Sequence, residues 1–307
     1  MSRPHPDGAP PAPDAFRSGF CAIVGRPNVG KSTLLNALLG EPVAITTPVP
    51  QTTRHAVRGV LHAADHQVVF VDTPGLHKAR TLLGSRLNDV ARDAAADVDV
   101  LLFVVDGAGG IGAGDRFVAG LLAPVAERTV AVVNKIDRLT PAAQLPAIAA
   151  TADLGQWAEV VPVSARTGDG VDTVRDLIVH RLPAGPPYFP PDQVSDQTPE
   201  RRVAERIREQ AIIRMREEVP HSVAVLVDEM VPGARDDLTV VHATIYVERT
   251  SQKGIVIGHR GAVLRDIGTA ARPEVERVLG TDVYLDLRVK LLKDWQGDPR
   301  SLDRLGY

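Results

Sequence analysis

A glycine-rich octapeptide stands between a short apolar run, Phe20–Val24, and a helical pattern, Lys31–Leu39. It fits the pattern G-x-x-x-x-G-K-[ST], and its residues are Gly25, Arg26, Pro27, Asn28, Val29, Gly30, Lys31 and Ser32, followed by Thr33. The glycines permit a tight turn whose amide N–H groups point inward, and the following helix adds its positive dipole. Lys31 would contact the β- and γ-phosphates of a nucleotide, and the Ser32 hydroxyl would bind Mg²⁺. The segment predicts a phosphate-binding loop between a strand and a helix.

Short β-branched runs alternate with helical patterns from Gly19 to about Pro183. We expect strands at Phe20–Val24, Val57–Leu61, Val68–Val71, Val100–Val105, Val130–Val133 and Val160–Val163. We expect helices at Lys31–Leu39, Leu82–Ala96, Ala113–Leu122, Pro141–Ala150 and Val171–Arg181. This alternation predicts an α/β domain in which helices cover both faces of a mostly parallel sheet. Pro162 places the last strand at an edge of that sheet.

Six prolines between residues 183 and 199 mark the end of this first domain. Each proline removes a backbone donor and restricts the residue before it, so neither a helix nor a central strand continues here. We interpret residues 18–183 as the first domain and residues 184–199 as a stiff, extended linker. Residues 1–17 hold five prolines and no apolar core of a signal peptide, so we expect a disordered arm.

Residues 200–307 follow a different pattern, typical of a smaller α+β domain. In chain order we expect a helix at Glu200–Glu218, strands at Val223–Met230 and Leu238–Val247, a helix at Gly261–Leu279 and a strand at Val283–Leu292. The first helix interleaves arginines with glutamates, which predicts a solvated face formed by Arg201, Arg202, Glu205, Arg206, Arg208 and Glu209. Trp295 and the tail Leu302–Tyr307 are expected to pack on the core of this domain.

Composition excludes several classes of protein. Hydrophobic residues make up 44% and charged residues 24% of the 307 positions, which is typical of a globular chain. The net charge of −3 provides no global positive field that would attract DNA or RNA. The single cysteine, Cys21, excludes an internal disulfide framework. Because the apolar runs are shorter than the ~18 residues of a membrane span, we expect a cytoplasmic protein.

The loop after the run Val130–Val133 indicates which base the nucleotide carries. It reads Asn134, Lys135, Ile136 and Asp137. The Asp137 carboxylate can accept hydrogen bonds from N1–H and the exocyclic amine of guanine, a pair that adenine does not offer. Lys135 would pack over the base, and Asn134 would tie this loop to the phosphate loop. After the next strand, backbone groups of Ser164, Ala165 and Arg166 would contact guanine O6. The alternative is an ATP-dependent enzyme with an unrelated second domain.

Two further segments would report the state of the γ-phosphate. The first follows the run Val68–Val71 and reads Asp72, Thr73, Pro74, Gly75 and Leu76. Asp72 would bind Mg²⁺, and the Gly75 N–H would reach the γ-phosphate because no side chain protrudes there. The second is the proline-broken stretch Glu41–Arg54, a candidate mobile loop. Its Thr53, with Thr52 as the second choice, would bind Mg²⁺ only in the triphosphate state.

Together these segments resemble the Era family of ribosome-assembly GTPases. The resemblance rests on GRPNVGKS, QTTRH, DTPGLH, NKID and SAR in the first domain, and on SQKGIVIGHRG, which is similar to the family's type-II KH domain. It covers about residues 18–307. It implies GTP binding, slow hydrolysis involving Lys31, Thr53 and Gly75, and binding of small-subunit (16S) ribosomal RNA near its 3′ end during 30S assembly. Peripheral membrane contact is also implied, whereas DNA binding is not.

The RNA-binding residues are expected around Gly258-His259-Arg260-Gly261. A G-x-x-G turn lets a nucleic-acid backbone approach closely, with helix N-terminal amides and basic side chains facing its phosphates. We expect the basic contacts to come from Lys253, His259, Arg260 and Arg265. The family commonly has asparagine and lysine where this chain has His259 and Arg260. The alternative is a GTP-dependent membrane- or protein-binding switch whose KH-like domain does not bind RNA.

Two residues bear on the rate of hydrolysis. Leu76 stands where Ras-type enzymes carry a glutamine that orients the attacking water. An aliphatic side chain cannot orient water, so slow intrinsic turnover is predicted. Asn28 resembles the asparagine that some relatives use to place a K⁺ ion beside the phosphates. Hydrolysis would release the γ-phosphate contacts of Gly75 and Thr53 and relax both the mobile loop and the segment Leu76–Arg86. We expect access to RNA to depend on the nucleotide state.

Overall fold

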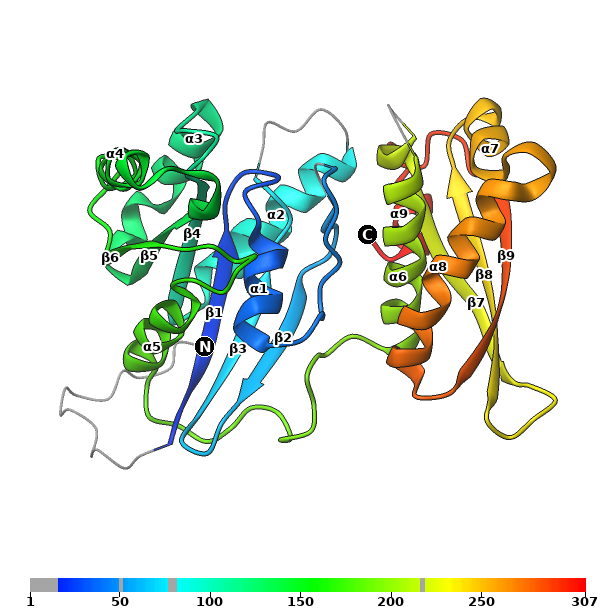
Figure 1. Cartoon of the computed structure of the whole chain (residues 1–307), viewed down its shortest axis with the longest axis horizontal. Helices are drawn as coiled ribbons and strands as arrows, with labels where there is room; N and C mark the ends of the chain where they lie inside the picture. The colour runs from blue at the N-terminus through cyan, green and yellow to red at the C-terminus, as the bar shows by residue number, and fades with distance from the viewer. Residues whose placement is uncertain (1–15, 50–51, 77–81, 216–218) are drawn as a thin grey trace.

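The computed structural model describes residues 16–49, 52–76, 82–215 and 219–307. The 1–17 arm therefore lies almost wholly outside the described residues, as do positions 77–81 of the segment Leu76–Arg86. Two layered bodies stand side by side, joined by an extended linker (Figure 1). The first is built on a six-stranded sheet and the second on a three-stranded sheet.

The first sheet has the strand order β2-β3-β1-β4-β5-β6. Its strands are β1 (Arg17–Val24), β2 (Val57–His62), β3 (His66–Asp72), β4 (Val100–Asp106), β5 (Thr129–Asn134) and β6 (Glu159–Pro162). Every neighbouring pair is parallel except β2 and β3, which are antiparallel. The predicted mostly parallel sheet is therefore confirmed, and β6, which contains Pro162, is an edge strand as expected.

Helices cover both faces of this sheet. They are α1 (Lys31–Leu39), α2 (Leu82–Ala96), α3 (Ala113–Leu122), α4 (Pro141–Ala152) and α5 (Val171–Arg181). Alternate residues of β1 point to opposite faces. Cys21 and Ile23 pack with the buried residues of α1 and α5, whereas Ala22 and Val24 pack with those of α3. The carboxyl ends of β1, β3, β4 and β5 thus meet at one edge, where ligands bind to such sheets.

The second sheet has the order β7-β8-β9, with β7 antiparallel and β9 parallel to β8. Its elements are α6 (Pro199–Arg214), β7 (Ala224–Pro232), β8 (Leu238–Val247), α7 (Thr250–Ile257), α8 (Ala262–Leu279), β9 (Asp282–Leu291) and α9 (Pro299–Leu305). Short 3-10 turns also occur at Ala123–Arg128, Ile136–Arg138, Pro220–Ser222 and His259–Gly261. Helices α6 and α8 pack together against the sheet (Figure 1). The predicted α+β class is confirmed.

The structure differs from the sequence prediction in three helices. The expected helix Glu200–Glu218 ends at Arg214, because Met215 has extended backbone (φ −103°, ψ 160°) and turns a buried side chain into the core. Positions 216–218 lie outside the described residues. Helix α7 was not predicted, since the β-branched run Ile255–Ile257 is typical of strands. Its buried face is formed by Gln252 and Val256, one helical turn apart. Helix α9 was also missed.

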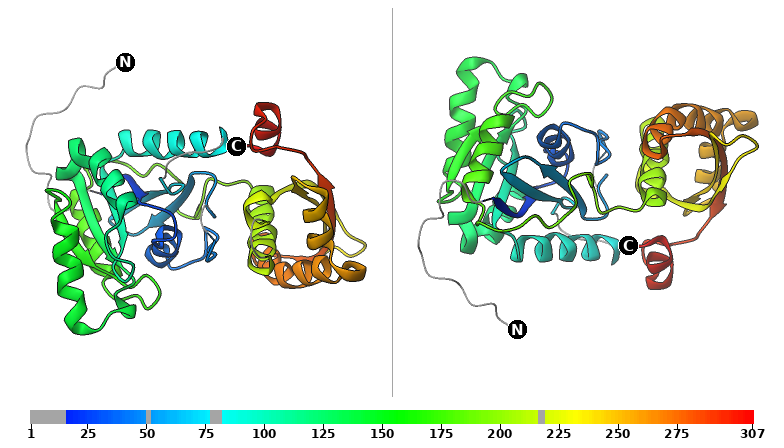
Figure 2. Two further views of the ribbon diagram at one scale, coloured as in Figure 1. Left: turned by 90° about the horizontal axis from the view of Figure 1, so that it is seen from above. Right: turned by 90° about the horizontal axis from the view of Figure 1, so that it is seen from below.

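The two domains contact one another directly, first where α2 meets the C-terminal segment. The N-terminal turns of α2 bury Leu83 and Leu87 against Trp295 and Leu302, so the expected packing of Trp295 and the tail is confirmed and also reaches the first domain. Both views in Figure 2 place α9 and the C-terminus beside this end of α2. Arg86 of α2 donates hydrogen bonds to Asp303 Oδ1 and to the Tyr307 carbonyl, each at 2.7 Å.

Helix α6 faces the first domain, which overturns one prediction. The alternating charges at its surface do not form a solvated face, because the relative exposures of Arg206, Arg208 and Glu209 are only 6%, 1% and 9%. Charge periodicity identifies a polar stripe, but it does not reveal a partner more than 100 residues away in the chain.

Among the described helices, including α6, none combines the length and apolar character that crossing a membrane requires.

Candidate functional site

The phosphate loop between β1 and α1 has glycine at both ends for conformational reasons. Gly25 has φ of 156°, and a Cβ there would lie 2.4 Å from the Val104 carbonyl oxygen. Gly30 has φ of 99°. The buried Lys31 donates from Nζ to the carbonyls of Gly25 and Arg26, each at 3.2 Å. Its ammonium group therefore lies on the loop and has only to exchange carbonyl oxygens for phosphate oxygens.

Three oxygen-bearing side chains converge beside this loop. The Ser32 hydroxyl donates to Asp72 Oδ2 at 2.6 Å, and Thr53 Oγ1 lies 2.9 Å from Ser32 Oγ and 3.2 Å from Asp72 Oδ2. Asp72 is fully buried, and burial raises the pKa of its carboxyl above the usual range. Its other oxygen, Oδ1, has no hydrogen-bond partner among the described residues. Hydroxyl and carboxylate oxygens are ligands that Mg²⁺ prefers, so this set fits a magnesium ion.

The two candidate threonines are separated by the structure. Thr53 joins Ser32 and Asp72, whereas Thr52 Oγ1 lies 2.6 Å from Thr47 Oγ1 and donates to the Val49 carbonyl at 2.7 Å. The hollow above the phosphate loop is lined by Pro27, Asn28, Gly30, Lys31, Ser32, Thr33, Ile45, Thr46, Thr47, Thr52, Thr53 and Gly75. The threonine loop, residues 41–54, therefore forms one wall of the nucleotide pocket; positions 50–51 lie outside the described residues.

The turn after β3 forms the opposite wall. A Cβ at Gly75 would lie 2.8 Å from backbone and side-chain atoms of Pro27, so only glycine lets the two segments approach this closely. Thr73 Oγ1 donates to the Ile23 carbonyl at 2.8 Å, and Pro74 is buried. Leu76 is 3% exposed and its N–H donates to the Gly25 carbonyl at 3.2 Å. Leu76 thus anchors the turn to the phosphate loop and presents no polar group to a water molecule.

Asn134, at the end of β5, joins three loops. Its Nδ2 donates to the Val29 carbonyl at 2.9 Å, and its Oδ1 accepts from the N–H groups of Lys135 (2.8 Å) and Ala165 (3.0 Å). The expectation that it ties the base-recognition loop to the phosphate loop is confirmed. Ile136 continues this arrangement, because its N–H donates to the Val163 carbonyl at 3.3 Å.

Asp137, in the loop after β5, has both carboxylate oxygens engaged by the loop after β6. Its Oδ1 accepts from Ser164 Oγ at 2.8 Å, and its Oδ2 accepts from the Arg166 guanidinium at 2.5 Å. The Asp137 side chain is 9% exposed, whereas that of Arg166 is 68% exposed. The sequence predicted only backbone contacts from Arg166, so the ion pair that its side chain forms with Asp137 was not anticipated.

Sequence reasoning missed two aspartates that support the site. Asp106, at the end of β4, accepts from Lys135 Nζ at 2.7 Å, and Lys135 Nζ also donates to the Asn28 carbonyl at 2.6 Å. The fully buried Asp115 of α3 accepts from Arg26 Nε at 3.0 Å and fixes the phosphate loop from outside. Neither lies in a contiguous motif, although the position of Asp106 at a parallel strand's carboxyl end was a usable signal.

The G-x-x-G turn lies between α7 and α8. Gly258, Arg260 and Gly261 have φ of 71°, 50° and 78°. A Cβ at Gly258 would lie 2.9 Å from the Val263 backbone nitrogen, whereas at Gly261 it would meet nothing within 4 Å. His259 and Arg260 are exposed. The turn is therefore a tight corner at the N-terminus of α8, with open space beside Gly261 and two exposed basic side chains.

A groove of about 280 Å³ runs from this turn between α8 and β9. Its lining includes Gly261, Leu264, Arg265, Gly268, Thr269, Arg272, Leu285, Asp286 and Leu287. The exposed Arg265 lies one turn of α8 beyond the corner and donates to the Arg260 carbonyl at 3.4 Å. Arg272, two turns further on, was not identified from the sequence. Leu264, Leu285 and Leu287 give the groove apolar surface, and Arg265 and Arg272 give it positive charge beside the carboxylate of Asp286. Apolar surface flanked by arginines suits a strand of bases with its phosphates at the edge.

Comparison with known proteins agrees with this geometry. A family model described as 50S ribosome-binding GTPase matches residues 20–135, and a KH domain model matches residues 218–296. GTPase Era of Mycolicibacterium paratuberculosis is 54% identical over 298 residues, which cover 95% of this chain and 99% of that protein. The chain belongs to the Era family of GTPases. GTPase Era of Mycobacterium tuberculosis is 52% identical over 297 residues, with the same coverage.

Two solved Era structures share the whole arrangement. One is Era in complex with MgGDPNP and nucleotides 1506–1542 of 16S ribosomal RNA, and the other is a variant of Aquifex aeolicus Era bound to GDP.AlF4−. Each has a TM-score of 0.92 and 39% sequence identity to this chain, and each comparison covers 95% of this chain and 99% of the other. The resemblance seen in the sequence is therefore confirmed over both domains.

Proposed function

We propose that this member of the Era family is a GTP-hydrolysing switch that binds 16S ribosomal RNA near its 3′ end and acts in 30S subunit assembly. The observation that carries the proposal is that one chain holds both the Ser32–Thr53–Asp72 oxygen set and the groove behind Gly258–Gly261. Residues 18–183 would form the GTP-binding domain, residues 184–199 the linker and residues 200–307 the RNA-binding domain. The Era structure with MgGDPNP and an RNA segment supports this division of labour.

The residues of the pocket divide the work of hydrolysis. Lys31 and the loop amides would bind the β- and γ-phosphates, and the Gly75 N–H would contact the γ-phosphate. A Mg²⁺ ion held by Ser32, Thr53 and Asp72 would neutralise charge that develops on the phosphate oxygens. Since the buried Leu76 offers no hydrogen bond to water, the chain has no counterpart of the water-orienting glutamine at this position. Hydrolysis should consequently be slow.

GTP binding should take up protons above neutral pH. Burial lowers the pKa of Lys31 to about 8 in the free protein. A triphosphate would raise this pKa again, so between the two values binding requires uptake of a proton and affinity falls as the pH rises above about 8. Calorimetry at about pH 8.5, in buffers of different ionisation enthalpy, measures this uptake. Binding without any proton uptake at that pH would contradict the role given to Lys31.

The monovalent ion is a finer part of the proposal. Asn28 lies at the mouth of the pocket with φ of 64°, and its Nδ2 donates to the Pro48 carbonyl of the threonine loop at 3.1 Å. We expect hydrolysis in K⁺ to exceed that in Na⁺ several-fold, and Asn28→Ala to remove the difference. Equal rates in the two salts would show that Asn28 places no catalytic K⁺.

Cellular location is also part of the proposal: cytoplasmic, with peripheral contact at the inner face of the cell membrane. Flotation of the protein with vesicles containing anionic lipid tests that contact. Recovery of the protein only in the bottom fraction, away from the vesicles, would contradict the proposed membrane contact.

The competing function is a GTP-dependent protein- or membrane-binding switch without RNA. Crosslinking the protein, loaded with a GTP analogue, to RNA of the 16S 3′ end discriminates between the two. We expect crosslinked peptides to contain Gly258–Gly261 and Arg265. If crosslinks are absent while GTP is hydrolysed normally, the RNA half of the proposal is wrong and the GTPase half stands.

A further inference from the structure

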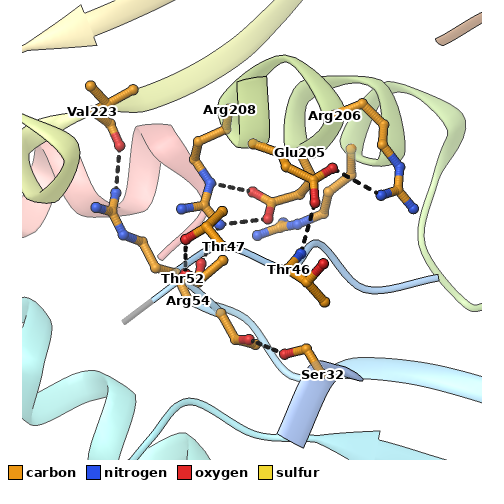
Figure 3. A network of polar contacts seen from close by, with 12 residues as sticks. Ser32, Thr46, Thr47, Thr52, Arg54, Glu205, Arg206, Arg208 and Val223 are labelled. Atoms are coloured by element: carbon orange, nitrogen blue, oxygen red, sulfur yellow. Dashed lines mark hydrogen bonds and ion pairs between the residues drawn. The ribbon is translucent and has the colours of Figure 1, made fainter. Parts of the chain in front are cut away.

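The second domain forms hydrogen bonds to several described positions of the threonine loop (Figure 3). The Thr46 N–H donates to Glu209 Oε1 at 2.8 Å, and the Thr52 carbonyl accepts a hydrogen bond from the Arg208 guanidinium. The Pro42 carbonyl accepts one from Arg206. These three α6 side chains are buried, so the contacts are shielded from water. The segment that the sequence indicates as a candidate mobile loop is therefore hydrogen-bonded to the second domain.

The residue after Thr53 is fixed by the same domain. The Arg54 guanidinium donates to the carbonyls of Val223 and His221, each at 2.7 Å. Its central carbon lies 5.3 Å from the Trp295 ring centroid and 5.7 Å from that of Tyr307. Only 4% of Arg54 is exposed. The planar fork of an arginine can serve two carbonyls while its faces contact aromatic rings, which an ammonium group cannot do.

Arg208 is itself held rigidly. Its Nε donates to Glu205 Oε1 at 2.8 Å and its Nη2 donates to Glu205 Oε2 at 2.6 Å, so the guanidinium forms a two-pronged ion pair on α6. Such a pair fixes orientation as well as position. The hydrogen bond to the Thr52 carbonyl therefore comes from a guanidinium whose position and orientation are set by Glu205.

Thr53 thus lies between two residues that the second domain fixes, Thr52 through its carbonyl and Arg54 through its side chain. Its own Oγ1 lies within 3.2 Å of both Ser32 and Asp72. We infer that Arg54 and Arg208 are positioning residues, through which the second domain holds Thr53 at the magnesium site. This inference rests on the magnesium-binding role proposed for Thr53.

The inference has a thermodynamic consequence. Coupling between two sites is reciprocal, so a Mg²⁺–triphosphate that orders Thr53 must strengthen the domain contact by the same factor. We call the contacts that Arg54 and Arg208 make across the domain boundary the clamp. A diphosphate lacks the γ-phosphate and its switch contacts, so its binding should not depend on the clamp. Removing Arg54 should therefore weaken binding of a GTP analogue and leave GDP affinity unchanged.

The test measures equilibrium binding of fluorescent GDPNP and GDP to the full chain over a Mg²⁺ titration. For Arg54→Ala we expect the ratio of GDPNP to GDP affinity to fall roughly tenfold, with a higher Mg²⁺ concentration at half-saturation. The affinity ratio of Arg54→Lys should lie between those of Arg54→Ala and the unmodified chain. If Arg54→Ala fails to fold, Arg54→Lys is measured in its place. The matched control is Arg58→Ala, because Arg58 is half-exposed and pairs at 3.2 Å with Asp196 of the linker.

A double-mutant cycle with Thr53→Ala decides whether Arg54 acts through Thr53. If it does, Thr53→Ala alone lowers the affinity ratio, and adding Arg54→Ala lowers it little further. Full additivity, or an effect of Arg58→Ala as large as that of Arg54→Ala, would overturn the inference. If Thr53→Ala lowers the ratio and neither Arg54 variant does, only the inference is wrong. If Thr53→Ala has no effect, the proposed magnesium ligand is wrong and the inference falls with it.

Discussion

Replacing Asp137 by asparagine is expected to weaken GTP binding by roughly 10³-fold and to make xanthosine triphosphate the preferred nucleotide. The carboxylate is 9% exposed and lies between the Ser164 hydroxyl and the Arg166 guanidinium. Its oxygens can accept both hydrogen bonds that guanine offers. An amide would set its NH₂ group against a guanine N–H, whereas the carbonyl of xanthine at that position would accept it. Competition between GTP, XTP and ATP for a fluorescent nucleotide measures the change.

The matched control for that experiment is Asp169→Asn. Asp169 is an exposed carboxylate near Ser164, and its Oδ2 accepts from Thr167 Oγ1 at 2.7 Å. The Asp169→Asn variant should leave the nucleotide preference unchanged. An unaltered nucleotide preference in Asp137→Asn would contradict the recognition of guanine by Asp137.

Placing aspartates at both glycines of the G-x-x-G turn is expected to weaken RNA binding by roughly 10²-fold or more and to leave GTP affinity unchanged. Two carboxylates at the N-terminus of α8 would repel phosphates where they must approach most closely. Gly261→Asp alone is the cleaner variant, because a Cβ there meets nothing within 4 Å, whereas one at Gly258 would clash with Val263. An anion at the start of a helix also stabilises it. Gel-shift titration with RNA of the 16S 3′ end measures the loss.

Gly280→Asp provides the control at the other end of α8. Gly280 has φ of 71°, and a Cβ there would meet nothing within 4 Å. The Gly280→Asp substitution therefore imposes a backbone strain similar to that of Gly261→Asp and adds the same charge. RNA binding should survive this change. Equal losses in Gly261→Asp and Gly280→Asp would show that net charge or stability, and not the turn, controls RNA binding.

The nucleotide pocket was predictable because its chemistry is local. Residues 25–32 and Asn134–Asp137 are contiguous, each follows an apolar strand, and phosphate and guanine recognition demand those residue types at that spacing. The clamp on the threonine loop was not predictable. Arg206 and Arg208 show the charge alternation of a solvated helix, and their partners lie more than 150 residues earlier in the chain. Only the tertiary structure reveals that the polar face of α6 is an interface with the first domain.

Helix α7 illustrates a second limit. Its sequence contains Gly254 and four β-branched residues, Thr250, Ile255, Val256 and Ile257, all of them less favourable in helices than alanine. The helix nevertheless forms, because Gln252 Oε1 accepts hydrogen bonds from the N–H groups of Glu248 (3.0 Å) and Arg249 (2.9 Å) and caps its start. Val256 is fully buried in the second core. Capping and burial together outweigh local propensity, and neither is evident from hydrophobic periodicity.

The central claim is that one chain couples a guanine nucleotide to RNA, and the most direct measurement is RNA affinity in different nucleotide states. The full chain would be titrated with RNA of the 16S 3′ end in GDPNP, in GDP and without nucleotide, each with Mg²⁺. We expect about tenfold or greater preference for the GDPNP state. Equal affinity in all three states would contradict coupling, and no binding in any state would contradict the RNA-binding function itself.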